Sequence, residues 1–315
     1  MTALAHCKLG DELAAVLVEA LPKSSLQGVG VEAPVAAAIL RRLDATGEAA
    51  GLTMLRVANE RRSLEILLDA LAEQAHSLGC RSLVGPFEAS PYLGQGVLSS
   101  HWRTPPLLTP YNPPYLPELA HGLMTHHRSL SLYRLEIDSH AATLDYRSCE
   151  QLQPARLEPR LLPLLRAACE HYADLPPLPA AEVRVIEALL SPYRWLGLVS
   201  RVEGQPIGVV LAITAVGRPL RPAGGLRGPA GWPLFRHRSR RHPAAGRVVL
   251  WGVLPEFRGR GFGRRLLAGL TCAAASRGLR ELIFGPVPAG SPSAGLLQSL
   301  GAEAERSFEL FRYEL

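Results

Sequence analysis

The spacing of apolar residues in the second half of the chain predicts a series of helices and strands. An apolar stripe at helical spacing runs through 157–172, and a second helix is predicted over 180–190. Two apolar runs, 196–202 and 206–214, are separated by Glu203-Gly204-Gln205, which is typical of a hairpin turn. This part of the chain therefore mixes helices with an antiparallel strand pair.

A buried strand is predicted over 247–254 and a helix over 263–277. The inward face of this helix carries Leu266, Leu267, Leu270 and Ala274. Residues 215–246, which precede the strand, are rich in Gly, Pro and Arg. Connections of that length are uncommon, so we expect either a functional lid or a flexible insertion.

Two segments carry the same landmarks in the same order. Residues 77–86 (SLGCRSLVGP) and 276–286 (SRGLRELIFGP) each predict a helix end, a glycine, a short strand and a Gly-Pro break. Each segment is then followed by a helical stretch ending near a glycine and by an apolar strand, namely Gly122 with 130–137 and Gly301 with 308–315. We interpret the two segments as copies of one α/β unit.

The chain length of 315 residues also favours two domains, at roughly 150 residues each. Apolar periodicity lapses over 138–156, which we interpret as a linker. The predicted division is a first copy over 1–137 and a second copy over 157–315. Hydrophobic residues make up 47% of the chain and charged residues 20%, as in folded globular proteins.

The net charge of +6 is concentrated in one segment. No acidic residue lies between Glu203 and Glu256, and eight arginines fall there. They are Arg218, Arg221, Arg227, Arg236, Arg238, Arg240, Arg241 and Arg247. The segment 217–247 indicates an anionic partner, such as a phosphate-bearing cofactor, a nucleic acid or a membrane surface, or else a solvated loop. Few aromatic residues interleave these arginines, which makes nucleic acid the weaker expectation.

Metal chemistry and membrane insertion are not indicated. The five cysteines form no CxxC pair, and the ten histidines show no HExxH or HxH spacing. No apolar run reaches the roughly 18 residues of a membrane span. The N-terminal residues include early acids and no apolar core, unlike a signal peptide. We therefore expect a cytoplasmic protein that has no metal site and no transmembrane segment.

The stretch with the clearest chemistry lies between the strand 247–254 and the helix that follows. It reads Pro255-Glu256-Phe257, then Arg258-Gly259-Arg260-Gly261-Phe262-Gly263. Its three glycines allow backbone N–H groups to converge, and a helix N-terminus adds partial positive charge. Together these features predict an anion cradle suited to a pyrophosphate. Arg258, Arg260, Arg264 and Arg265 add positive charge around it.

A Walker loop is excluded because it requires a lysine that is absent here. A Rossmann fingerprint needs GxGxxG, whereas this loop reads GxGxG. Leu254-Pro255 followed by Arg258, Gly261 and Gly263 instead resembles the [QR]-x-x-G-x-[GA] signature of the GNAT acyltransferase superfamily. The resemblance covers 157–315 well and 1–137 more loosely. Residues 85–119 resemble a largely uncharacterised bacterial group of tandem members.

The resemblance implies an α/β (α+β) fold of two tandem GNAT-like domains, each a mixed, mostly antiparallel sheet flanked by helices. It also implies a splay at a bulge near Trp251-Gly252-Val253 and an acyl-CoA, expected to be acetyl-CoA, bound by the second copy. The backbone groups of Val253 and Leu254 are expected to contact the pantetheine, and the N–H groups of 259–263 to hold the pyrophosphate. The implied cofactor-binding residues are Val253, Leu254, Arg258, Gly259, Arg260, Gly261, Phe262, Gly263 and Arg264.

The first copy departs from the pattern, because Ala58-Asn59-Glu60-Arg61-Arg62-Ser63 holds no glycine where the cradle should lie. We therefore expect no CoA there, although Asn112 and Tyr115 are kept. In the second copy, Leu297 stands where the superfamily usually has its tyrosine acid, and Ser291 and Ser293 stand in the usual asparagine region.

The catalytic residues therefore stay unassigned. Glu256 is a weak candidate base, for which a solvated or helix-capping role is favoured. His101, Tyr111 and Tyr115 could reach across from the first copy, although structural roles are favoured for them as well. The aromatic insertion 86–111 is expected either to form a wall of an acceptor pocket or to pack against the other copy.

The expected function is acyl-CoA-dependent N-acyl transfer, with an acetyl group as the acyl group and a small-molecule or lipid amine as acceptor. Two alternatives stay open. One is a non-catalytic acyl-CoA sensor, suggested by the missing acid and base. The other is a polyanion binder that uses the arginines of 217–247.

Overall fold

The computed structural model describes residues 3–10, 13–19, 36–43, 48–88, 90–102, 109–137, 149–151, 161–169, 178, 180–191, 193–213 and 245–315. The basic segment 217–247 lies outside the described residues except for its last three. The same holds for the linker 138–156 except for 149–151, which form a short strand. None of the described helices is long and apolar enough to cross a membrane.

The first copy is built from strands, two helices and a two-residue strand in the insertion. In chain order these are β1 (Ala3–Gly10), β2 (Leu13–Glu19), β3 (Ala36–Arg42), β4 (Ala49–Val57), α1 (Arg61–Ser77), β5 (Ser82–Phe87), β6 (Val97–Leu98), α2 (Leu116–His121) and β7 (Thr125–Glu136).

The second copy repeats the same plan and adds two helices near its start. Its elements are β8 (Cys149–Gln151), α3 (Leu162–Cys169), α4 (Ala180–Leu190), β9 (Trp195–Val202), β10 (Gln205–Ile213), β11 (Ala245–Val253), the 3₁₀ turn η3 (Pro255–Phe257), α6 (Phe262–Ala275), β12 (Glu281–Pro288), α7 (Pro292–Ser299) and β13 (Glu303–Glu314). The order β4-α1-β5-α2-β7 matches β11-α6-β12-α7-β13 when the insertion is left out, so the predicted internal repeat is confirmed.

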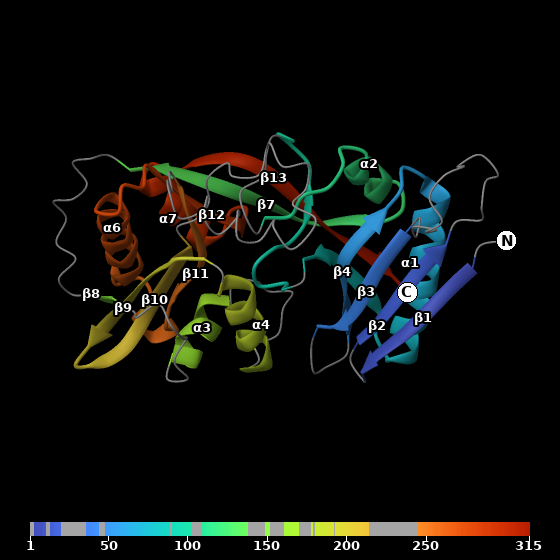
Figure 1. Ribbon diagram of the computed structural model, residues 1–315, viewed down its shortest axis with the longest axis horizontal. Helices are drawn as coiled ribbons and strands as arrows, with labels where there is room; N and C mark the ends of the chain where they lie inside the picture. The colour runs from blue at the N-terminus through green and yellow to red at the C-terminus, as the bar shows by residue number, and fades with distance from the viewer. Residues whose placement is uncertain are drawn as a thin grey trace, which may run out of the picture.

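The described strands form one mixed sheet in the order β1-β2-β3-β4-β5-β13-β7-β12-β11-β10-β9-β8, and β6 pairs with β13 beside this path. Among the described strands, two neighbouring pairs are parallel, β4 with β5 and β11 with β12. The sheet is therefore mostly antiparallel, with one parallel pair in each copy. Figure 1 shows helices of each copy lying against its own part of the sheet.

The closing strands of the two copies are exchanged. β7 of the first copy pairs with β12 of the second, and β13 of the second copy pairs with β5 of the first. β7 and β13 also pair with each other along most of their length, from Arg134 with Glu303 to Thr125 with Arg312. In Figure 1 these two strands run through the middle of the molecule, and the C-terminus lies over the first copy. Each copy is thus completed by the last strand of the other.

The sheet of the second copy is buried on both faces, which explains its continuous apolar runs. Leu198, Val210 and Ala212 point to α6, whereas Val199 and Val209 lie on the face of α3 and α4. This alternation is the two-residue period of a strand.

The insertion 86–111 packs against the other copy, as one of the two expectations held. Tyr92 and Leu93 of the insertion are buried in the same cluster as Leu164, Val249 and Leu250 of the second copy. The guanidinium of Arg247, only 1% exposed, donates to the Leu93 carbonyl at 3.2 Å. A segment of the first copy therefore forms part of the second copy's core.

Candidate functional site

The loop before α6 adopts a conformation that its glycines permit. Gly259 has φ +74° and Gly261 has φ +80°, in the left-handed region that L side chains rarely adopt. Gly261 is the N-cap residue of α6, and no side chain caps this end of the helix. The loop therefore turns directly from η3 into the first turn of the helix.

The start of α6 presents backbone donors without covering them by a capping side chain. The first intrahelical bond runs from Arg265 N–H to the Gly261 carbonyl, at 3.0 Å. The N–H groups of Phe262, Gly263 and Arg264 precede it and have no intrahelical acceptor. Because the first turn of α6 holds no acidic residue, these donors and the helix dipole suit an anion.

Two arginines flank this loop on aromatic supports. The Arg265 guanidinium lies 4.3 Å from the centroid of the Phe262 ring, and that of Arg260 lies 5.7 Å from the Phe257 ring. The two rings meet edge to face at 5.9 Å. Stacking on rings limits the freedom of both guanidinium groups, so their positive charge stays beside the loop.

Arg258 was predicted to add positive charge around the cradle, but its side chain bonds to backbone carbonyls of the protein. Its Nε donates to the Val253 carbonyl at 3.0 Å, and a terminal nitrogen lies 3.4 Å from the Ala167 carbonyl of α3. The side chain thus ties the loop to the end of β11 and to a neighbouring helix. This contact gives Arg258 a role in holding the loop in place.

β11 and β12 diverge beside the cradle loop. They pair in parallel from Ala245 with Glu281 to Val248 with Phe284, although both strands continue beyond this point. The register of β11 against β10 also shifts at Val249, since Leu211 faces Leu250 and Ala212 faces Val248. A bulge is thus present in β11 at Val249, two residues before Trp251-Gly252-Val253 and near the expected position. β11 stops pairing with β12 directly before it, after Val248.

The backbone of Leu254 is already hydrogen-bonded within the protein. Its N–H donates to the Ile207 carbonyl at 2.9 Å, and its carbonyl accepts from Phe257 N–H at 3.0 Å. The Leu254 N–H is therefore engaged within the protein, whereas its carbonyl oxygen has a second lone pair for the expected pantetheine contact. The Val253 carbonyl is bonded to Arg258, as described above.

The proton-transfer candidates lie in varied surroundings. Glu256 is exposed in η3. Leu297 is fully buried in the core beneath α7. Ser291 is the N-cap of α7 and accepts a hydrogen bond from Ala294 N–H at 3.2 Å. Because a buried leucine and a capping serine replace the usual donors, the structure adds no general acid to the sequence prediction.

The first-copy candidates serve local structure. Tyr115 donates from its hydroxyl to the Val57 carbonyl at 2.8 Å, at the end of β4. Asn112 is buried and bonds to both backbone groups of Leu98 and to the Pro113 carbonyl. His101 is exposed, with φ +56°. The structural role favoured for Tyr115 agrees with its hydrogen bond, and the roles of His101 and Tyr111 stay predictions.

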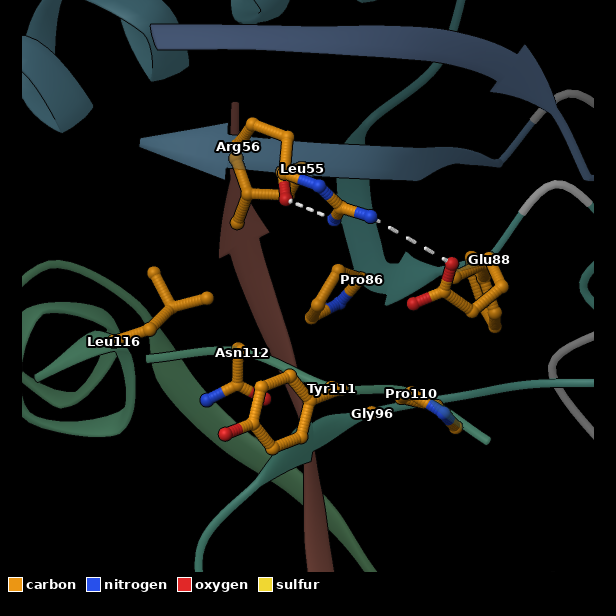
Figure 2. Close-up of a pocket in the computed structure, with 10 residues that line it drawn as sticks. Leu55, Arg56, Pro86, Glu88, Gly96, Pro110, Tyr111, Asn112 and Leu116 are labelled. Atoms are coloured by element: carbon orange, nitrogen blue, oxygen red, sulfur yellow. Dashed lines mark hydrogen bonds and ion pairs between the residues drawn. The ribbon is translucent and has the colours of Figure 1, made fainter. Parts of the chain in front are cut away.

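Residues of the insertion 86–111 also line a hollow in the first copy, although the sequence analysis did not predict its position or size. It has a volume of about 320 Å³ and lies between the end of β4 and residues 111–116. A smaller hollow of about 20 Å³ adjoins it and reaches Pro86 and Glu88 (Figure 2). Arg56 and Tyr111 line both hollows.

The family model of the acetyltransferase (GNAT) family matches residues 167–302. Among curated proteins, no sequence relative was found. A tandem GNAT protein from the clavulanic acid biosynthesis pathway is similar in structure, with a TM-score of 0.56 and 14% identity, over 96% of this chain and 82% of that one.

Two further structures share the fold. One is a GCN5-related N-acetyltransferase from Anabaena variabilis, with a TM-score of 0.50 and 10% identity, over 96% of this chain and 62% of that one. The other is the glucosamine N-acetyltransferase region of a fungal multi-domain β-N-acetylglucosaminidase, with a TM-score of 0.56 and 13% identity. This chain aligns over 97% of its length with 33% of that protein.

Proposed function

Residues 167–302 belong to the GNAT acetyltransferase family, and from this premise we propose that the protein transfers an acyl group from an acyl-CoA to an amine. The second copy binds the acyl-CoA, and the acyl group is acetyl. The acceptor is a small-molecule or lipid amine. The first copy does not bind CoA.

The observation that carries this proposal is the loop 258–263 at the start of α6. Two left-handed glycines and an N-terminus without a capping side chain turn backbone N–H groups toward one place. Arg260 and Arg265 stand beside them on aromatic rings. Phosphate oxygens are the acceptors that such a set of donors fits best.

The chemistry requires an amine nitrogen to attack the acyl carbonyl carbon and the thiolate to leave. A bound acyl-CoA supplies the activated thioester. The protein's part is to hold its phosphates at 259–263 and to leave the gap between β11 and β12 open for the pantetheine arm. Position and orientation alone supply much of the rate in such a transfer, and water carries the protons.

The non-catalytic alternative, an acyl-CoA sensor, is favoured by one observation. The side chain at the family's acid position is Leu297, which is 0% exposed and cannot donate a proton. No Asp or Glu occurs over 204–255, so neither β10 nor β11 carries a carboxylate. A sensor would bind acyl-CoA tightly and release no CoA with any amine.

Calorimetric titration with acetyl-CoA, CoA and a long-chain acyl-CoA tests the assignment. Gly261→Glu places a carboxylate in the cradle and should abolish binding. Gly278→Glu is the matched control, because Gly278 also has positive φ, at +76°, but follows the opposite end of α6. Equal affinity in the two folded variants would reject the cradle. Release of CoA with an amine panel then separates the enzyme from the sensor.

A further inference from the structure

The hollow of the first copy occupies the place that corresponds to the acyl-CoA gap of the second. It lies beyond the last paired residues of β4 and β5, Thr53 and Phe87. Its volume of about 320 Å³ is at the small end of the roughly 300–1,000 Å³ range of ligand pockets. A ligand of metabolite size fits such a space, whereas a whole coenzyme A does not.

The neighbouring helix start also argues against a phosphate ligand. The N-cap of α1 is Glu60, in place of the left-handed glycine of α6. Its carboxylate accepts from the Ser63 hydroxyl at 2.7 Å and so stays at the first turn of the helix. A carboxylate in this position repels an anion that approaches the N-terminus. The hollow thus lacks the feature that would anchor a pyrophosphate.

Two opposite charges face each other at the rim of the two hollows. An Arg56 terminal nitrogen lies 4.0 Å from a Glu88 carboxylate oxygen, too far for a hydrogen bond (Figure 2). Arg56 also donates to the Leu55 carbonyl at 2.7 Å, which leaves further donors of its five N–H groups for a ligand. The pair is therefore loose. Arg56 lines both hollows, whereas Glu88 lines only the smaller one that adjoins the larger.

Glu88 is the less hydrated member of this pair. Its side chain is 32% exposed, whereas that of Arg56 is 61% exposed. Burial raises the pKa of the Glu88 carboxyl, and the charge of Arg56 opposes this shift only in part. A second cation at this carboxylate would compensate for its lost hydration.

The remaining walls are apolar or aromatic. Leu55 and Leu116 are buried beneath the hollow, and the ring of Tyr111 is 48% exposed at its mouth. Asn112 and Tyr115 line it as well, but their polar groups are bonded to backbone atoms, as described above. The free polar chemistry of the two adjoining hollows thus comes from one cation, Arg56, and one anion, Glu88.

We propose that the two adjoining hollows together form a second ligand site, and that this site binds a free α-amino acid with an apolar or aromatic side chain. Arg56 holds the α-carboxylate, Glu88 holds the α-ammonium, and the side chain lies against Tyr111 and Leu55. An amino acid carries both charges on neighbouring atoms, which matches the close approach of Arg56 and Glu88. This site is additional to the proposed acyl transfer, and all of its residues belong to the first copy.

The test is a thermal-shift screen of the whole chain with each standard L-amino acid at millimolar concentration, followed by calorimetry on the best ligand. Two analogues of that ligand, one without the amine and one without the carboxylate, probe the two charges. Arg56→Gln and Glu88→Gln should each weaken binding about tenfold or more. Arg62→Gln is the matched control, because Arg62 is an exposed arginine on α1 that pairs with Glu65 outside the hollow.

The expected result is one amino acid per chain, with weaker binding of both analogues, unchanged binding in Arg62→Gln and unchanged acetyl-CoA binding in all variants. The proposal is overturned if no amino acid raises Tm, if either analogue binds as well as the amino acid, or if neither glutamine variant weakens binding. Because acetyl-CoA is titrated separately, failure here is distinguishable from failure of the proposed acyl transfer.

Discussion

At the scale of single residues, the structure gives Arg258 of the predicted cradle motif a role in holding the loop in place. The sequence predicted charge around a phosphate cradle from Arg258, Arg260, Arg264 and Arg265. Arg258 instead bonds to the Val253 carbonyl and approaches that of Ala167. Which carbonyl a guanidinium meets depends on packing between distant elements, so the pattern of the loop alone could not predict it.

We expect Arg258→Ala to lower the free energy of unfolding by about 1 kcal/mol, because it removes a charge-assisted hydrogen bond that holds the loop to β11. Acetyl-CoA affinity should fall with it, since the loop loses its support. Urea unfolding and calorimetry measure the two effects. Arg264→Ala is the comparison, because Arg264 is exposed in the first turn of α6 and should lower affinity without lowering stability.

Replacing Glu88 is expected to raise stability at neutral pH, whereas replacing Arg258 is expected to lower it. Burial raises the pKa of its carboxyl above the value of the unfolded chain, so ionisation is less favourable in the folded state. The stability that this group contributes is present below the unfolded pKa and is lost as pH rises through the folded pKa. Glu88→Gln should therefore be slightly more stable than the native chain at neutral pH and equally stable in acid. Urea unfolding at both pH values, without added amino acid, measures this difference. A variant less stable than the native chain at neutral pH would contradict the prediction.

At the scale of elements, the strands and helices of the second copy followed from apolar spacing. The predicted hairpin is β9 and β10, and the predicted strand and helix around the cradle are β11 and α6. β8 escaped prediction, since a strand of three residues is too short to show a period. The exact position of the bulge, at Val249, depends on how β11 pairs with β10, which the spacing of apolar residues does not specify.

Contacts between elements predict whether each of two glycine-to-alanine substitutions lowers or raises the free energy of unfolding. A Cβ on Gly208 of β10 would lie 2.7 Å from Leu266 of α6 and 3.2 Å from Val253, so Gly208→Ala should lower stability by about 1–3 kcal/mol. A Cβ on Gly295 of α7 meets nothing within 4 Å, so Gly295→Ala should raise stability by about 0.5–1 kcal/mol through helix propensity. Urea unfolding checks both, and equal signs would contradict the packing described.

At the scale of the whole molecule, the repeat could be predicted but the strand exchange could not. The closing strands read LSLYRLEI and FELFRYEL, and their alternating apolar residues are alike. Either strand therefore fits beside either parallel pair, and the pattern does not specify the partner. The division of the sequence into 1–137 and 157–315 stays a prediction. In the folded sheet, the part built by each copy also contains the closing strand of the other copy.

This exchange predicts that the two copies stay together when the chain is cut. A specific protease site inserted at residue 142, within the predicted linker, would yield two fragments after cleavage. Because β7 and β13 each pair with the other copy and with one another, the fragments should co-elute on size exclusion in native buffer and separate only in denaturant. Phe308, Leu310 and Phe311 of β13 are fully buried among first-copy residues, which adds apolar burial to the backbone pairing. The cleaved complex should also still bind one acetyl-CoA. Separation of the fragments without denaturant would show that the two closing strands do not hold the copies together in solution.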